Sequence, residues 1–256
     1  MHYTPILVLI IASTIQGVPS NKRDFYDTIA SPGQFPFVVS IDDPVDASSD
    51  IPQPAHDCPG VIINNNWVLT AARCFSYLKF NRTVNVGTNV LHSGGTRYNM
   101  IDYFQHDNYT ITSTKNNIAL IRIDGQFEFN ELVQPIEYGD FEENSACVEI
   151  GWEYLSNFEF LEDLRFINLT VIGYEKCKEI AGDILGDEDL GPEQMCSLRP
   201  EGGESCRGNA GGPLVCDGKL VGIGSFALPP CEEGSPNVYE RPMAYIDWIE
   251  RIIREN

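Results

Sequence analysis

Short apolar runs separated by glycine, proline and asparagine recur along most of the chain. Examples are residues 35–41, 58–63, 67–74 and 220–223. Each run has the length of one β-strand, and the residues between the runs are those that favour turns. This pattern predicts an all-β fold built from many short strands.

The C-terminal segment, residues 243–254, has a different periodicity. Its apolar side chains recur at the spacing of one helical face, and the charged ones lie on the other side. The apolar face is Tyr245, Trp248, Ile249, Ile252 and Ile253, and the charged face is Glu250, Arg251 and Arg254. The apolar stripe is narrow and interrupted by charge, so the segment is predicted to be a helix that packs on the core and not on a membrane.

The first twenty residues contain no Lys, Arg, Asp or Glu, and residues 6–12 form a continuous apolar run. Small residues follow near Gly17 and Ser20, as they do at the end of a secretory signal peptide. The prediction is a signal peptide over residues 1–20, cleaved near 17–20, and one domain over 21–256. A buried strand is the alternative interpretation. No other run approaches the ~18 apolar residues of a membrane span.

The charge is strongly acidic: 17 basic against 37 acidic residues give a net charge of −20 over 256 residues. This balance argues against nucleic acid and anionic membranes as partners. Residues 42–57 are acidic and rich in proline, which predicts an exposed loop. That loop is interpreted either as a site for a basic partner or as a solvated insertion without a role.

The eight cysteines are an even number, and in a secreted chain they predict four disulfides. Their spacing alone leaves the pairing open. No Cys-x-x-Cys or Cys/His cluster indicates a metal site, and no motif indicates a cofactor.

Residues 204–216 are the most informative stretch. Two cysteines frame a glycine-rich turn that leads into an apolar run, and small residues there let backbone N–H groups turn toward one point. The stretch resembles the Gly-Asp-Ser-Gly-Gly-Pro nucleophile loop of trypsin- and chymotrypsin-like serine proteases. In this chain Ala210 stands at the serine position, and Asn209 at that of the preceding aspartate.

Other motifs carry the same resemblance. Residues 69–74 resemble Leu-Thr-Ala-Ala-His-Cys, but Arg73 stands at the position of the histidine base. Residues 116–120 resemble Asn-Asp-Ile-Ala-Leu, with Asn117 at the position of the aspartate that orients that histidine. Pro32-Gly33-Gln34-Phe35-Pro36 resembles the entry to the first barrel of the family. His106 is interpreted as a surface or structural residue, and His56 and His92 as loop residues without a partner motif.

The activation switch of the family is also altered. Where active members expose a new Ile-Val-Gly-Gly terminus, this chain has Asp24-Phe25-Tyr26-Asp27 after Lys22-Arg23. A charged Asp24 is costly to bury, and Asn209 offers no charge to pair with an inserted amine.

The resemblance covers about residues 24–253. It implies two six-stranded antiparallel β-barrels with a C-terminal helix and the site in a cleft between the barrels. It also implies the disulfides Cys58–Cys74, Cys147–Cys216, Cys177–Cys196 and Cys206–Cys231.

The cleft residues implied by the resemblance are also degenerate. Gly208 matches the oxyanion-hole glycine and is interpreted either as a binding amide or as a residue that only shapes the turn. The expected specificity pocket consists of Glu204, Ser205, Ser225, Phe226, Ala227 and Asn237, with the Asn237 side chain filling the slot. Three sequons, at Asn81, Asn108 and Asn168, predict glycosylation in a secreted chain.

Together these features predict a secreted, monomeric, catalytically inactive homologue of the family. Such a protein would bind another protein, a protease, an inhibitor or a receptor, as a regulator, decoy or cofactor in an extracellular proteolytic, reproductive or immune pathway. The alternatives are a working endopeptidase with an unrecognised nucleophile, for which Ser205 is the nearest candidate, and a scaffold or storage protein.

Overall fold

The structure, a computed structural model, describes residues 28–44, 55–76, 81–152, 161–185, 190–198, 209–228 and 235–256. The predicted signal peptide, Lys22-Arg23 and the stretch after it lie outside these residues. Glu204, Ser205, Cys206, Gly208 and Cys231 also lie outside them.

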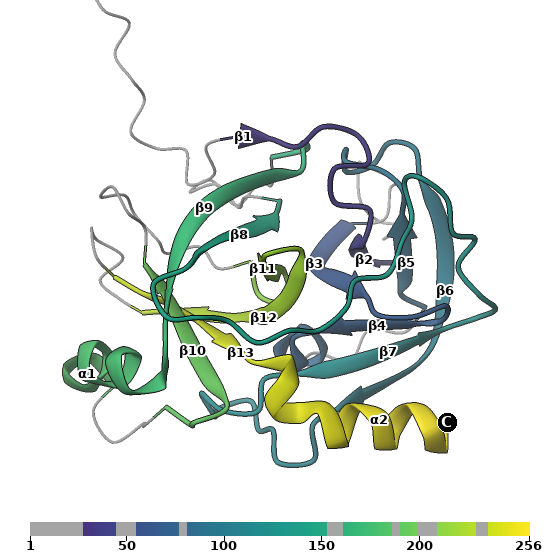
Figure 1. Cartoon of the computed structure of the whole chain (residues 1–256). Helices are drawn as coiled ribbons and strands as arrows, with labels where there is room; N and C mark the ends of the chain where they lie inside the picture. The colour runs from purple at the N-terminus through teal and green to yellow at the C-terminus, as the bar shows by residue number, and fades with distance from the viewer. Residues whose placement is uncertain are drawn as a thin grey trace, which may run out of the picture.

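The first half of the chain closes into an antiparallel barrel, on the right of Figure 1, with the strand order β2-β3-β4-β7-β6-β5. Val84 and Val86 of β5 are buried in the barrel, and Tyr98 and Met100 of β6 are partly buried against the same cluster. The strands are β2 (Val38–Asp43), β3 (Ala55–Ile62), β4 (Trp67–Thr70), β5 (Thr83–Val86), β6 (Thr96–Gln105) and β7 (Ala119–Ile123). A 3₁₀ turn, η1 (Ala72–Phe75), follows β4.

The second half forms a matching barrel, because β8 pairs with β9 on one side and with β11 on the other. Its strands are β8 (Ala146–Gly151), β9 (Arg165–Ile172), β10 (Gln194–Leu198), β11 (Pro213–Cys216), β12 (Lys219–Ala227) and β13 (Asn237–Glu240). The short β1 (Thr28–Ile29) adds to β9. The predicted pair of six-stranded antiparallel barrels is therefore confirmed.

The C-terminal segment begins with a second 3₁₀ turn, η2 (Pro242–Tyr245), and continues as α2 (Ile246–Glu255). Trp248, Ile249 and Ile252 are buried and join an apolar cluster that includes Trp67 and Leu120 of the first barrel. Burying a side chain of this size contributes about 1.5–3 kcal/mol. The predicted docking helix is confirmed. None of the helices in the described part of the chain combines the length and hydrophobicity that a membrane span requires.

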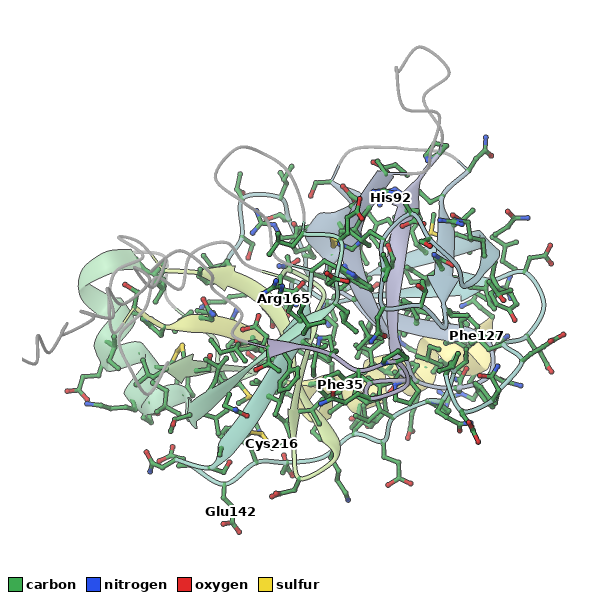
Figure 2. The ribbon with its side chains drawn as sticks, turned by 90° about the horizontal axis from the view of Figure 1, so that it is seen from above. Phe35, His92, Phe127, Glu142, Arg165 and Cys216 are labelled. Carbon is green, nitrogen blue, oxygen red and sulfur yellow. A yellow bond between two sulfur atoms is a disulfide. The ribbon has the colours of Figure 1, made fainter. Side chains whose placement is uncertain are left out.

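Apolar contacts also join the two barrels directly. Phe35, labelled between them in Figure 2, packs edge-on against Phe166 of β9, with ring centroids 5.3 Å apart. In the same view Phe127 marks the side of the first barrel and Cys216 that of the second. One apolar cluster therefore contains side chains from both barrels, so residues of the two barrels meet where the barrels touch.

Three of the four expected disulfides are present: Cys58–Cys74, Cys147–Cys216 and Cys177–Cys196. The fourth, Cys206–Cys231, falls outside the described residues. The loop closed by Cys177 and Cys196 contains a helix that the sequence analysis did not predict, α1 (Tyr174–Leu185).

The prediction of an exposed acidic loop over residues 42–57 is wrong at both of its ends. Strand β2 continues to Asp43, and β3 begins at Ala55. Asp42 is buried, and the buried guanidinium of Arg82 pairs with Asp43 at 2.9 Å and with Asp57 at 2.8 Å. Asp43 and Asp57 are therefore neutralised within the fold, and Asp42 forms a further ion pair with Arg97 at 3.4 Å. The middle of the loop, residues 45–54, lies outside the described residues.

The interpretation of His56 as a loop residue without a partner is also wrong. His56 lies in β3, is buried, and has its Nδ1 2.7 Å from Ser40 Oγ. Ser40 Oγ in turn hydrogen-bonds Asp42, and the His56 ring lies 5.1 Å from that of Trp152. Burial lowers the pKa of His56 to about 3, so the imidazole is neutral in the folded chain.

The role of the buried Arg82 guanidinium can be tested by substitution. Its Nη1 also donates to the carbonyl oxygen of Cys74 at 2.5 Å, next to Arg73. We expect Arg82→Met to lower the free energy of unfolding by about 3–5 kcal/mol, because both carboxylates and the carbonyl lose their donor. Urea unfolding with the disulfides intact measures this free energy of unfolding. The control is Lys176→Met, which removes an exposed ion pair with Glu179 and should cost below about 1 kcal/mol. Equal losses in the two variants would contradict the assignment.

Candidate functional site

The 3₁₀ turn η1 presents Arg73 to the solvent. The chain leaves β4 through an extended Ala71 and then turns, so that Ala72, Cys74 and Phe75 are buried and Arg73 alone of the four is exposed. The disulfide of Cys74 with Cys58 holds this turn on the barrel. The expected strand over residues 67–74 therefore ends at Thr70, and the turn that replaces its end decides where residue 73 points.

Asn117 lies just before β7 and is buried. Its Oδ1 accepts a hydrogen bond from the backbone N–H of Arg73 at 2.8 Å. Its Nδ2 donates to Ser225 Oγ at 2.9 Å and to the Ser225 carbonyl oxygen at 3.3 Å. The amide thus uses its acceptor toward the first barrel and its donor toward the second.

Ala210 lies on the turn before β11 and packs against the apolar cluster of the first barrel. Its carbonyl oxygen is 3.7 Å from Cys74 Sγ. The next residue, Gly211, has φ +92°, and a Cβ there would collide with Thr70 Oγ1. Glycine is therefore required where this turn meets β4. The structure brings Arg73, Asn117 and Ala210 together at the contact between the barrels.

Asn209 is buried beside glycines of the second barrel. Its Nδ2 donates to the carbonyl oxygen of Ile150 at 2.5 Å, and its Oδ1 has no hydrogen-bond partner among the described residues. A Cβ at Gly151 or Gly212 would overlap the Asn209 side chain. Residue 209 therefore places a neutral amide in a close-packed environment.

Strand β12 supplies the second barrel's side of the site. Ser225 is buried, and its carbonyl oxygen accepts from Arg73 Nη1 at 3.3 Å as well as from Asn117. Phe226 and Ala227 follow it and pair with β13, where Ala227 faces the buried Asn237. Ser225 therefore contacts both Arg73 and Asn117. The expected pocket and oxyanion hole stay predictions, because Glu204, Ser205 and Gly208 are outside the described residues.

Glu240, at the end of β13, is a site residue that the sequence analysis missed. It is fully buried, and its Oε1 accepts from Gln194 Nε2 at 2.8 Å and from Ser225 Oγ at 3.3 Å. Its Oε2 accepts from Tyr245 OH at 2.5 Å. Burial raises the pKa of Glu240 to about 7, although the donors around it oppose this rise. One acidic residue at a strand end is an ordinary surface pattern, so the sequence offered no signal for it.

The chemistry available at this cluster is limited. Residue 210 presents a methyl group, residue 73 a guanidinium that keeps its proton, and residue 117 an amide. His106 lies elsewhere, against the rings of Tyr245 and Trp248, and burial lowers its pKa. In the described ranges no group of three His, Cys, Asp or Glu side chains is arranged to hold a metal ion.

Comparison with known proteins gives consistent matches. The family model described as Trypsin matches residues 28–249. Chymotrypsin-2 of Vespa crabro is 31% identical over 229 residues, covering 88% of this chain and 97% of its own length. Trypsin II-P29 of Gallus gallus is also 31% identical, over 210 residues, covering 77% of this chain and 80% of its own.

The fold also matches a solved structure. Neuropsin, a serine protease expressed in the limbic system of mouse brain, superposes with a TM-score of 0.74 at 24% sequence identity. The match covers 88% of this chain and 97% of that one, and it shows the shared fold. Because the family model spans most of the chain and a relative at 31% identity spans 88% of it, this chain belongs to the trypsin family.

Proposed function

We propose that this chain is a catalytically inactive member of the trypsin family that acts by binding another protein. By the resemblance, Arg73, Asn117 and Ala210 stand at the positions of base, orienting acid and nucleophile. The observation that supports the proposal is that they lie near one another: the Arg73 N–H donates to Asn117 Oδ1 at 2.8 Å, and the Ala210 carbonyl oxygen is 3.7 Å from Sγ of Cys74, the residue after Arg73. Their side chains cannot replace the groups that this chemistry needs.

Each step of peptide-bond hydrolysis in this family needs a reactive group that this chain lacks at the matching position. An acyl intermediate needs an oxygen nucleophile, and Ala210 has none. Activating a serine needs a base that is neutral near pH 7, and the Arg73 guanidinium stays protonated. Stabilising an imidazolium needs a carboxylate, and Asn117 is an uncharged amide.

The surroundings of the cluster support the same proposal. Arg73 Nη1 and Asn117 Nδ2 both donate to the Ser225 carbonyl oxygen, so this acceptor has no free lone pair for a peptide N–H. The side chain of Asn209 donates to Ile150 and carries no charge, so a new N-terminal amine would find no ion-pair partner there. The missing nucleophile at residue 210 and the uncharged side chain at residue 209 therefore support the proposed inactivity independently.

Secretion follows in the proposal from the predicted leader and is supported by three disulfides, which persist in oxidising compartments. All three sequon asparagines, Asn81, Asn108 and Asn168, are exposed. The proposed partner is a protease, an inhibitor or a receptor in an extracellular proteolytic, reproductive or immune pathway. The case for a basic partner now depends on the net charge of −20, since Arg82 neutralises Asp43 and Asp57.

Activity is tested with pure protein, before and after trypsin treatment followed by removal of the trypsin. We expect no turnover of ester substrates and no labelling by an active-serine phosphonate probe. The variant Ala210→Ser should also stay unlabelled, because Arg73 cannot accept the serine proton. An active trypsin is the positive control. Turnover that Ser205→Ala abolishes would establish the alternative, an endopeptidase with a different nucleophile.

Secretion and glycosylation are tested by expressing the full chain in a eukaryotic secretory host. We expect the protein in the medium, with a new N-terminus between residues 18 and 21 and a mass that falls on treatment with an N-glycosidase. Single Asn→Gln changes at the three sequons identify the modified positions. Retention in the cells with residues 1–20 still attached would contradict the proposal.

Binding is tested by capture from the extracellular fluid in which the chain occurs. We expect a saturable partner whose affinity falls at least tenfold in Arg73→Glu, because Arg73 is the exposed group at the centre of the site. Lys176→Glu, on the exposed face of α1, is the matched control for the charge change. Absence of a saturable partner would favour the scaffold or storage alternative.

A further inference from the structure

The Ser225 hydroxyl lies between Asn117 and Glu240, and it has one hydrogen to donate. Its oxygen is 3.3 Å from Glu240 Oε1 and 2.9 Å from Asn117 Nδ2. An ionised carboxylate only accepts hydrogen bonds, so the hydroxyl hydrogen goes to Glu240. The remaining neighbour of the hydroxyl must then be a donor. An amide at position 117 meets this requirement, and a carboxylate does not.

The other contacts of Glu240 leave no alternative arrangement. Tyr245 OH donates to Oε2, and Gln194 Nε2 donates to Oε1 while its second hydrogen goes to the carbonyl oxygen of Thr114. Gln194 Oε1 is used as well, because it accepts from the backbone N–H of Gly191 at 2.9 Å. The amide of Gln194 is therefore fixed in orientation, and the carboxylate is held by uncharged donors from β10, β12 and η2 and by the backbone N–H of Asn117.

We propose that Asn117 and Glu240 form one coupled unit, in which the buried carboxylate of Glu240 requires residue 117 to be a hydrogen-bond donor. Glu240 is then a positioning residue. It orients the Ser225 hydroxyl, which orients the Asn117 amide, whose Oδ1 holds the backbone N–H of Arg73. This inference concerns the free chain and does not depend on the proposed binding function.

The unit explains why an aspartate is unsuited to position 117 in this chain. In the variant Asn117→Asp, the introduced carboxylate and an ionised Glu240 would compete for the one hydrogen of Ser225, in a buried place where like charges repel strongly. The two carboxyl groups would relieve the conflict by keeping one proton, and would then titrate as a coupled dyad. The cost of an aspartate is therefore small at a pH where Glu240 is protonated, and large where Glu240 is ionised.

The titratable and charged groups near Glu240 come from several elements. Tyr245 of η2 donates a hydrogen bond to the Glu240 carboxylate. Arg73 of η1 donates to the carbonyl oxygen of Ser225, whose hydroxyl contacts Glu240. The His106 ring packs edge-on against the Tyr245 ring, and the charge of Glu193 also acts on Tyr245. Burial together with the Glu240 charge raises the pKa of Tyr245, so Tyr245 remains a donor at neutral pH.

A double-mutant cycle tests the coupling. The folding equilibrium constant is measured by urea unfolding, with the disulfides intact, for the native chain, Asn117→Asp, Glu240→Gln and the double variant. At pH 8 we expect Asn117→Asp to lower this constant at least tenfold more in the native background than in Glu240→Gln. The difference should shrink at pH 4.5, where Glu240 is protonated. The cycle cancels any cost that Glu240→Gln has by itself.

The matched control is Asn85→Asp, a change at another buried asparagine, in β5 of the first barrel. It introduces a buried carboxylate away from the Asn117–Ser225–Glu240 contacts, so its cost should be equal in both backgrounds. If Asn117→Asp fails to fold alone but folds with Glu240→Gln, the coupling is also established. Equal loss from Asn117→Asp in both backgrounds, or failure to fold in both, would overturn the proposal.

A second measurement needs no change at position 117. Burial raises the pKa of Glu240 from 4.5 to about 7, so its protonated form stabilises the fold fully below pH 4.5. This stabilisation is lost as the pH rises toward 7. The folding constant of the native chain, divided by that of Glu240→Gln, should fall by about two orders of magnitude over this range. A ratio that does not change with pH would overturn the assignment of Glu240.

Discussion

The hydroxyl of Ser225 takes part in hydrogen bonds from both barrels, and it has one hydrogen to give. Asn117 reaches it from the first barrel, and Glu240 from the second. Because there is only one hydrogen, the hydroxyl donates to Glu240 and accepts from Asn117. Asn117 accepts the N–H of Arg73 with its oxygen, the only acceptor of the amide, while its nitrogen donates to Ser225. The described site therefore combines a neutral amide at residue 117 with the buried carboxylate of Glu240.

Under the proposed function, this arrangement explains how a trypsin fold can persist with different side chains at its active-site positions. The turn that carries Ala210 contacts β4 through Gly211, and Cys74 is tied to β3 by its disulfide, so neither depends on the side chain at position 210. Apolar contacts such as that of Phe35 with Phe166 also hold the barrels together. The backbone around residue 210 is therefore compatible with different side chains at that position.

Much of the fold could be predicted, because the motifs around Arg73, Asn117 and Ala210 are local in sequence and each carries its own structure. The apolar face of residues 243–254 likewise identified the docking helix. The errors share another cause. Asp42 and His56 are polar residues that the fold buries in paired strands, and Glu240 becomes part of the site through Ser225 and the backbone N–H of Asn117. Such contacts depend on which strands become neighbours, and composition or spacing along one strand does not show that.

Gly211 has a consequence for the way this chain can vary over time. Its backbone has φ +92°, and a Cβ would collide with Thr70 and Pro59, so nearly every substitution there would disturb both barrels. Ala210, one residue earlier, is partly buried, and its side chain carries no bond on which the fold relies. Substitution is therefore much more restricted at residue 211 than at residue 210. The path of this loop is set by the glycine and would persist with a different small side chain at residue 210.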